Sequence, residues 1–294
     1  MPSPGLEPDF RSSPRGDRVF AGALMSCAIV AAAVVLFIIV FVFWESIPAL
    51  VDVGAHRFVS DSSWHPTEGR FNLLPMVAGT LLVTVGAVAL AIPLGLTSAF
   101  FCHQYAPRAL VSPYRRLIQL LAGIPSVVYG FWGLVVLVPI IGSWQPPGAS
   151  LLAGALILSV MILPTVALTA EIALAAVPAE LVRGAAALGL GRRATLFGVV
   201  LPAARGGILS GVFLAIARAV GETMAVLMVC GNVVEVPDSV FDPVRTLTAN
   251  IALEMAYAMG DHRAALFVTG LVLSLFIVVL VLVNARLTRE TAHA

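Results

Sequence analysis

The chain has 294 residues, of which 60% are hydrophobic and 11% are charged, and its mean hydropathy is +1.00. This composition excludes an ordinary soluble domain and favours a protein embedded in lipid. The net charge of +1 excludes the strongly basic surface that nucleic-acid binding requires.

Six apolar stretches are long enough to cross a bilayer as helices, because a hydrocarbon core about 30 Å thick needs about 20 residues per span. We predict spans at about residues 22–44, 73–101, 117–141, 151–176, 206–230 and 264–285. The pattern predicts an all-α membrane protein with six transmembrane helices over residues 21–288, with core spans at about 73–285. A disordered cytoplasmic tail, rich in Pro and Ser, is expected at 1–20. Residues 289–294 are expected to form a short cytoplasmic tail.

Arginine carries all the positive side-chain charge, since the 17 basic residues include no lysine. If the amino terminus is cytoplasmic, 12 arginines lie in cytoplasmic segments, 4 lie outside and Arg218 lies within a span. Positive charge concentrates on the cytoplasmic side of membrane proteins, so this asymmetry predicts that both termini are cytoplasmic. The first apolar run is too long for a secretory signal, and we expect it to remain attached.

Two loops are expected to contain helices. The segment 177–205, on the predicted cytoplasmic side, should form a helix, a glycine turn and a second short helix, which Pro202 ends before the fifth span. A loop that only sets topology is the alternative interpretation. On the other side, the amphipathic stretch 244–259 is expected to be a helix lying near the outer surface.

Few ionisable side chains fall within the predicted spans, where each costs roughly 2.5 to 3.5 kcal/mol. Arg218 and Glu222 are four residues apart, so a continuous fifth span would place them on one face. Either they neutralise each other at a helix interface, or the Arg218 guanidinium lines a water-filled path for an oxyanion. Glu171 is expected to snorkel to the inner interface. A proline and two glycines at 123–130 predict a break in the third span that faces protein or water.

Patterns typical of catalysis are absent from the sequence. A nucleotide-binding P-loop needs a lysine, and the five histidines form no His-Glu-x-x-His pattern. The three cysteines lie within spans or at their ends and imply no disulfide. We therefore expect a chain that is not an enzyme and holds no cofactor or metal.

The loop at 183–202 resembles the coupling loop of binding-protein-dependent ABC importer permeases. The family pattern is Glu-Ala-Ala, three residues, Gly, nine residues, Ile, one residue, Leu-Pro. Its spacing is kept at Gly189, Val199, Leu201 and Pro202. Arg183 and Gly184 replace the leading glutamate and the first alanine, whereas Ala185 keeps the second alanine.

Further segments resemble the C-type permease family of phosphate-specific transporters. They are residues 43–50, 121–130, 218–225 followed by Gly231-Asn232, and 241–250. The run Gly221-Glu222-Thr223-Met224-Ala225 favours the C-type permease over its homologous A-type partner. The resemblance covers about residues 20–288.

This resemblance implies a type I ABC importer permease (MetI-like) fold and a permease subunit for inorganic phosphate in the bacterial inner membrane. The implied partners are a homologous A-type phosphate permease, two copies of a cytoplasmic ABC ATPase that hydrolyses ATP, and an extracytoplasmic phosphate-binding protein. The resemblance assigns Arg218, Glu222 and Thr223 to the substrate pathway. It assigns the ATPase-coupling surface to Arg183, Gly184, Ala185, Gly189, Leu201 and Pro202.

Other interpretations also fit the sequence. The chain is then a permease for another oxyanion such as sulfate, molybdate or phosphonate, or a non-transporting membrane subunit that senses phosphate supply. An intramembrane enzyme fits least well, because the catalytic patterns named above are missing.

Overall fold

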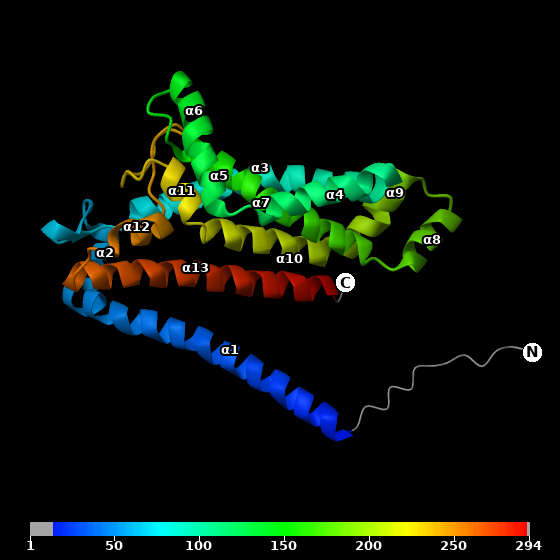
Figure 1. The fold of residues 1–294 in the computed structure, drawn as a ribbon, viewed down its shortest axis with the longest axis horizontal. Helices are drawn as coiled ribbons and strands as arrows, with labels where there is room; N and C mark the ends of the chain where they lie inside the picture. The colour runs from blue at the N-terminus through cyan, green and yellow to red at the C-terminus, as the bar shows by residue number, and fades with distance from the viewer. Residues whose placement is uncertain (1–13, 293–294) are drawn as a thin grey trace, which may run out of the picture.

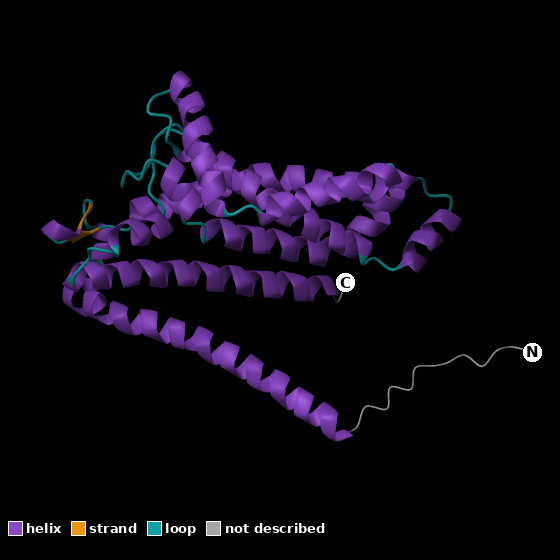
Figure 2. Ribbon diagram, viewed as in Figure 1, coloured by secondary structure: helices purple, strands orange, loops and turns teal. Residues whose placement is uncertain are grey.

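The computed structural model describes residues 14–292, and within them the helices are joined by loops and accompanied by one short β-hairpin (Figures 1 and 2). In this part of the chain, six segments are long and apolar enough to cross a membrane, at Asp17–Gly54, Leu74–Tyr105, Ser126–Trp144, Leu151–Ala175, Arg192–Val220 and Gly260–Thr288. The all-α class and the number of spans are therefore confirmed. Most of the predicted amino-terminal tail, residues 1–13, lies outside the described residues, whereas α1 (Pro14–Pro48) already includes 14–20.

The centre of the bundle is built from α3 (Leu74–Phe100), α7 (Leu151–Ala175) and α10 (Leu201–Val220). Glycines lie where these helices cross, because a Cβ at Gly95 of α3 would be 2.8 Å from the Val166 Cβ of α7. A Cβ at Gly211 of α10 would overlap the Thr169 side chain of α7. Small residues at crossings let helices pack closely in lipid, which is why α7 is the most buried span.

The first and last spans form the outer layer. Figure 1 shows α1 meeting α13 (Gly260–Ala292) at one end and diverging from it toward the other. At the meeting point the Phe41 and Phe267 rings lie edge to face at 5.8 Å, and Glu45 pairs with Arg263 at 4.0 Å. Most other apolar side chains of α1 are exposed, Phe37 by 67%, so lipid or another subunit surrounds this helix.

The two ends of the bundle differ in what they carry. The α8 end carries α8 (Ala179–Ala187) and α9 (Arg192–Thr195), and Figure 1 shows α1 beginning and α13 ending on that side. The opposite α12 end carries α2 (Arg57–Ser60), β1 (Trp64–His65), the 3-10 turn η2 (Pro66–Glu68), β2 (Arg70–Phe71) and α12 (Leu247–Glu254). The antiparallel hairpin pairs Trp64 with Phe71. Single π-helical turns extend α1 and α3, as η1 (Ala49–Gly54) and η3 (Phe101–Tyr105).

The third span is interrupted, as the sequence predicted. The helix α4 (Arg108–Gly123) ends at Ile124, whose extended backbone is the conformation favoured before a proline. After Pro125 the chain continues through α5 (Ser126–Trp132), η4 (Gly133–Leu137) and α6 (Val138–Trp144). Figure 1 shows α5 and α6 leaving the bundle at a steep angle to α4. The apolar length that can cross a membrane is therefore Ser126–Trp144, later than the predicted 117–141.

The fifth span begins and ends earlier than the predicted 206–230. The helix α9 continues through η5 (Leu196–Val200) into α10, so Arg192–Val220 is one uninterrupted helix. The prediction that Pro202 ends a separate short helix is wrong. Pro202 follows directly on the π-helical turn η5, and this wider turn accommodates the proline ring within the continuous helix.

Candidate functional site

A helix break follows Arg218 in the middle of the molecule. The helix α10 ends at Val220, residues Gly221–Thr223 are not helical, and α11 (Met224–Val229) begins after them. The prediction that Arg218 and Glu222 share one face of a continuous helix is therefore wrong. The physical reason is that the Glu222 side chain accepts a hydrogen bond from the Ala225 N–H at 3.1 Å and so caps the start of α11.

Arg218 lies in the last turn of α10, within a membrane span, and its side chain is exposed. Within residues 14–292 it makes no hydrogen bond or ion pair, so the first of the two alternatives, a neutralising pair with Glu222, is not formed. Figure 1 places the end of α10 beside the middle of α13. An arginine within a span is costly in lipid, so its five N–H donors must face water, a solute or another subunit.

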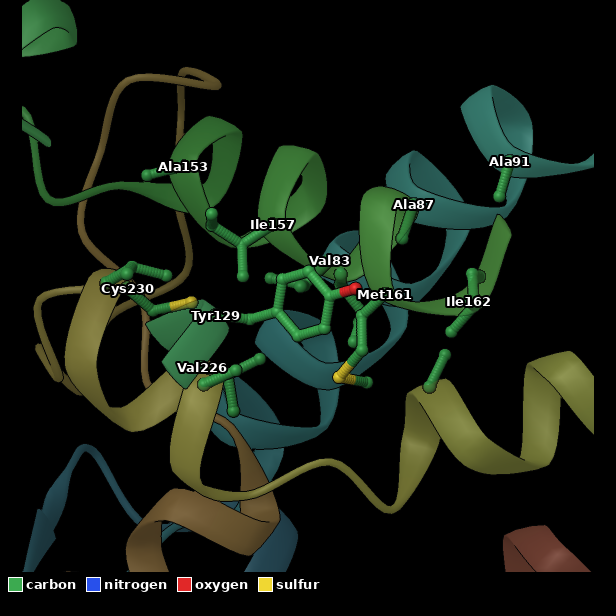
Figure 3. Close-up of a cluster of buried hydrophobic side chains, with 14 of the residues drawn as sticks. Val83, Ala87, Ala91, Tyr129, Ala153, Ile157, Met161, Ile162, Val226 and Cys230 are labelled. Atoms are coloured by element: carbon green, nitrogen blue, oxygen red, sulfur yellow. The ribbon is translucent and has the colours of Figure 1, made fainter. Parts of the chain in front are cut away.

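The break in the third span lies against the break after α10. The Tyr129 hydroxyl of α5 donates a hydrogen bond to the Leu121 carbonyl of α4 at 2.8 Å, across the interruption at Pro125. A Cβ at Gly130 would be 2.9 Å from the Ala225 Cα, so α5 and α11 are in direct backbone contact. Figure 3 shows Tyr129 among the buried side chains of this region. Two interrupted helices thus meet beside one uncompensated arginine.

Thr223, the third predicted pathway residue, is half-buried within the same break. Its hydroxyl donates to the Gly221 carbonyl at 3.3 Å, a local bond that stabilises the turn. The structure thus brings Arg218, Glu222 and Thr223 into one short segment but gives them different surroundings. Arg218 is exposed, Glu222 caps α11, and Thr223 closes the turn.

The α8 end carries the predicted helix and glycine turn. Gly189 has φ of 75°, and the Gly189 and Leu190 N–H groups donate to the carbonyls of Ala186 and Ala185 at 3.0 and 3.1 Å. This pair of bonds is a Schellman motif, which requires a residue in the left-handed region. Leu188 at the tip is 81% exposed, so the turn presents an apolar side chain away from the bundle.

The coupling residues taken from the resemblance lie in different surroundings. Ala185 is buried at 4% exposure, whereas a Cβ at Gly184 would meet nothing within 4 Å. Arg183, in the place of the family's glutamate, pairs with Glu180 at 2.8 Å, and both side chains are about three-quarters exposed. Leu201 and Pro202 belong to the start of α10 and continue the same helix toward the break.

Two charged clusters were missed by sequence reasoning. Glu171 was expected to snorkel, but its carboxylate pairs with Arg115 of α4 and is only 13% exposed. At the α12 end, Glu254 accepts hydrogen bonds from Trp64 Nε1, Arg245 Nη1 and His262 Nε2, at 2.9, 2.6 and 2.8 Å. Trp64 and Glu254 are 190 positions apart, so no local pattern indicates their contact. Within the described residues, no group of three or more His, Cys, Asp or Glu side chains could hold a metal ion.

The fold and this site together indicate the class of protein to which the chain belongs. A six-span helical bundle, with interrupted helices around an unpaired arginine inside and a protruding helix at one end, is built as a membrane permease subunit. Residues 91–293 match the family model of the binding-protein-dependent transport system inner membrane component, and the chain belongs to that family. The resemblance drawn from the coupling-loop spacing is thereby confirmed.

Individual relatives cover most of the chain. It is 38% identical over 256 residues to the probable ABC transporter permease protein YqgH of Bacillus subtilis, which covers 84% of this chain and 83% of that protein. It is 34% identical over 292 residues to the phosphate transport system permease protein PstC of Mesorhizobium japonicum, covering 92% and 89%. The PstC protein of Xylella fastidiosa (strain Temecula1) is 36% identical, covering 83% and 81%.

A solved structure shares the fold. A chain of the inward-facing MetNI methionine ABC transporter superposes with a TM-score of 0.57 at 18% identity, covering 74% of this chain and 94% of that one. The expected importer-permease fold is therefore confirmed.

Proposed function

We propose that this chain is the C-type permease subunit of an ATP-driven importer of inorganic phosphate, and that Arg218 contacts the phosphate as it passes. The observation that carries this proposal is the exposed, unpaired Arg218 beside a helix break inside a membrane span. The PstC relatives, whose names describe phosphate transport, support the choice of substrate.

The chemistry of the site favours an oxyanion. A guanidinium presents a planar fork of donors that matches the oxygens of phosphate, and it remains charged at any physiological pH. Because the Glu222 carboxylate is turned toward the start of α11, it does not consume those donors. Glu222 and Thr223 shape the break, and Arg218 supplies the positive charge that the passing anion meets.

The proposal extends to the orientation of the chain in the membrane and to the proteins that contact it. The α8 end faces the cytoplasm, in keeping with the arginine bias, and its exposed Leu188 and Arg183–Glu180 pair form the surface on which one of two ATPase copies docks. A homologous A-type permease covers exposed apolar side chains of α5 and α6, such as Phe131 and Trp132. A phosphate-binding protein delivers substrate at the α12 end, and alternating access moves the substrate between the two sides.

The decisive experiment is ATP-dependent uptake of radiolabelled phosphate into cells that lack this gene and are complemented with variants. Arg218→Ala and Arg218→Lys should both reduce the maximal uptake rate, alanine more strongly, because lysine keeps the charge but loses the planar fork. Arg286→Ala is the matched control, since Arg286 is an exposed arginine of α13 far along the chain from the break. Immunoblots of the membrane fraction establish that each complex is assembled.

The outcomes separate the alternatives. Competition by unlabelled phosphate, and not by sulfate or molybdate, supports the substrate assignment. Unchanged uptake in the assembled Arg218→Ala complex would overturn the role of Arg218. Loss of phosphate-dependent gene regulation with intact uptake would instead favour a sensing subunit.

A further inference from the structure

The short helix α12 connects the two polar regions described above. It follows the loop after α11 and precedes α13, and its members Leu247, Thr248, Ala249, Asn250 and Glu254 are buried. The sequence predicted a longer helix near the outer surface, at 244–259. The helix is present but has 8 residues and packs inside the α12 end of the bundle, where Figure 1 also shows it. A buried polar helix of this length has to satisfy its hydrogen bonds with neighbouring elements.

The first contact of α12 is with the break beside Arg218. Thr248 is only 5% exposed, and its hydroxyl donates a hydrogen bond to the Glu222 carbonyl at 2.7 Å. That carbonyl lies outside both α10 and α11, so Thr248 supplies a bond that neither helix provides. The Glu222 N–H in turn donates to the Ala219 carbonyl at 3.2 Å, in the last turn of α10. Thr248 therefore acts on the turn that carries Arg218.

The start of α12 is fixed to α3. Thr246 caps the helix by accepting from the Ala249 N–H at 3.2 Å, and its hydroxyl lies 3.1 Å from that of Thr248. The Leu247 N–H donates to Thr80 Oγ1 of α3 at 2.9 Å. A Cβ at Gly79 would lie 2.6 Å from the Arg245 carbonyl oxygen, so the two backbones touch. This anchoring holds Thr248 in one place relative to the core.

The last residue of α12, Glu254, is held by three other segments at the α12 end of the bundle. The Glu254 side chain is 9% exposed and binds Trp64 of the hairpin, Arg245 before α12 and His262 at the start of α13. All four side chains line a cavity of about 480 Å³ at the α12 end. One buried carboxylate thus ties three separate segments to the helix that contacts the break.

We propose that α12 is the positioning element for Arg218. Thr248 is a positioning residue that fixes the Gly221–Thr223 break through the Glu222 carbonyl, and Glu254 fixes α12 to the segments around the cavity. Neither residue contacts substrate. This inference rests on the proposed role of Arg218 in transport, because positioning matters only if the arginine acts there.

The test compares Thr248→Val, which keeps the shape and removes the hydroxyl, with Thr248→Ser, which keeps the hydroxyl. Both are measured in the complete membrane complex with its ATPase and binding protein. Hydrogen–deuterium exchange of amides 219–226 reports the break directly, and phosphate uptake reports its consequence. We expect faster amide exchange and about a tenfold lower maximal uptake rate for valine, at an unchanged half-saturating phosphate concentration, and near-normal values for serine.

Several results would overturn the proposal. Normal exchange in residues 219–226 of the valine variant would show that the bond does not hold the break, and normal uptake would show that the bond does not matter for transport. An equal loss with serine would mean that side-chain shape, and not the hydroxyl, is responsible. If Thr248→Val fails to assemble, the smaller Thr248→Ala removes the same bond without any clash. Failure of the proposed function is seen separately, as unchanged uptake in Arg218→Ala.

Discussion

Replacing the buried Glu254 should destabilise the α12 end strongly, and the structure sets the size of the effect. Glu254→Ala leaves Arg245, whose side chain is 18% exposed, without its carboxylate, and it leaves the Trp64 and His262 donors without an acceptor. Breaking a buried ion pair by removing one partner costs about 3–5 kcal/mol. Glu254→Gln keeps the shape and one carbonyl oxygen, so its expected cost is about 1–2 kcal/mol.

The assay is thermal unfolding of the purified detergent-solubilised protein, followed by tryptophan fluorescence, since Trp64 lies at the cluster. At about 2 °C per kcal/mol for a chain of this size, alanine should lower the Tm by about 6–10 °C and glutamine by about 2–4 °C. The matched control is Glu180→Ala, which removes the carboxylate of the exposed ion pair with Arg183. Solvent screens that pair, so the Tm should not change measurably.

Two outcomes for the Tm values of the Glu254 and Glu180 variants would contradict this prediction. Equal Tm changes for Glu254→Ala and Glu180→Ala would show that burial does not set the strength of these pairs. A glutamine variant as unstable as the alanine variant would show that the negative charge, and not the hydrogen-bonding shape, dominates at Glu254.

Three further predictions concern packing, topology and pH. Gly211→Val should lower the Tm, because the valine side chain would overlap Thr169 and separate α10 from α7 at a cost of about 1–3 kcal/mol. A normal Tm would contradict the close packing of α10 against α7 at Gly211. Arg192→Cys, in a background without the native cysteines, should be labelled by an impermeant thiol reagent only from the cytoplasmic side, and labelling from outside would overturn the proposed orientation. Burial would raise the pKa of Asp61, but hydrogen bonds from the Phe71 N–H and from Arg57 outweigh burial and hold it below its usual value. Asp61 therefore stabilises the α12 end above its unfolded pKa of about 3.9, and this contribution is lost as the pH falls through the lower folded value. Asp61→Asn should flatten the acid limb of a Tm-against-pH curve, and an unchanged limb would exclude this role.

The features that the sequence predicted correctly are those with local causes. Span length and hydropathy determine the six helices, and the Gly-Ile-Pro run determines the break before α5, since a proline acts on its own neighbours. The turn at Gly189 is predictable for the same reason, because only glycine adopts its φ of 75° without strain.

The features that the sequence did not predict depend on distant partners or on competition between two local rules. Helical spacing alone pairs Arg218 with Glu222, but Glu222 caps α11, and the end of α10 separates the two residues. The helix-breaking tendency of Pro202 is offset by the π-helical turn before it. The Glu254 cluster joins residues from three parts of the chain and has no local signature.

The uninterrupted helix from Arg192 to Val220 has a mechanical consequence. Its 29 residues form a rod about 43 Å long, at 1.5 Å per residue, with the α8 end of the molecule at one tip and Arg218 near the other. A tilt of about 10° around its midpoint would carry each tip by about 4 Å in opposite directions, by the geometry of a rod of that length. A displacement of that size exceeds the length of a hydrogen bond, so a small push on one face of the membrane is enough to make or break contacts at the arginine.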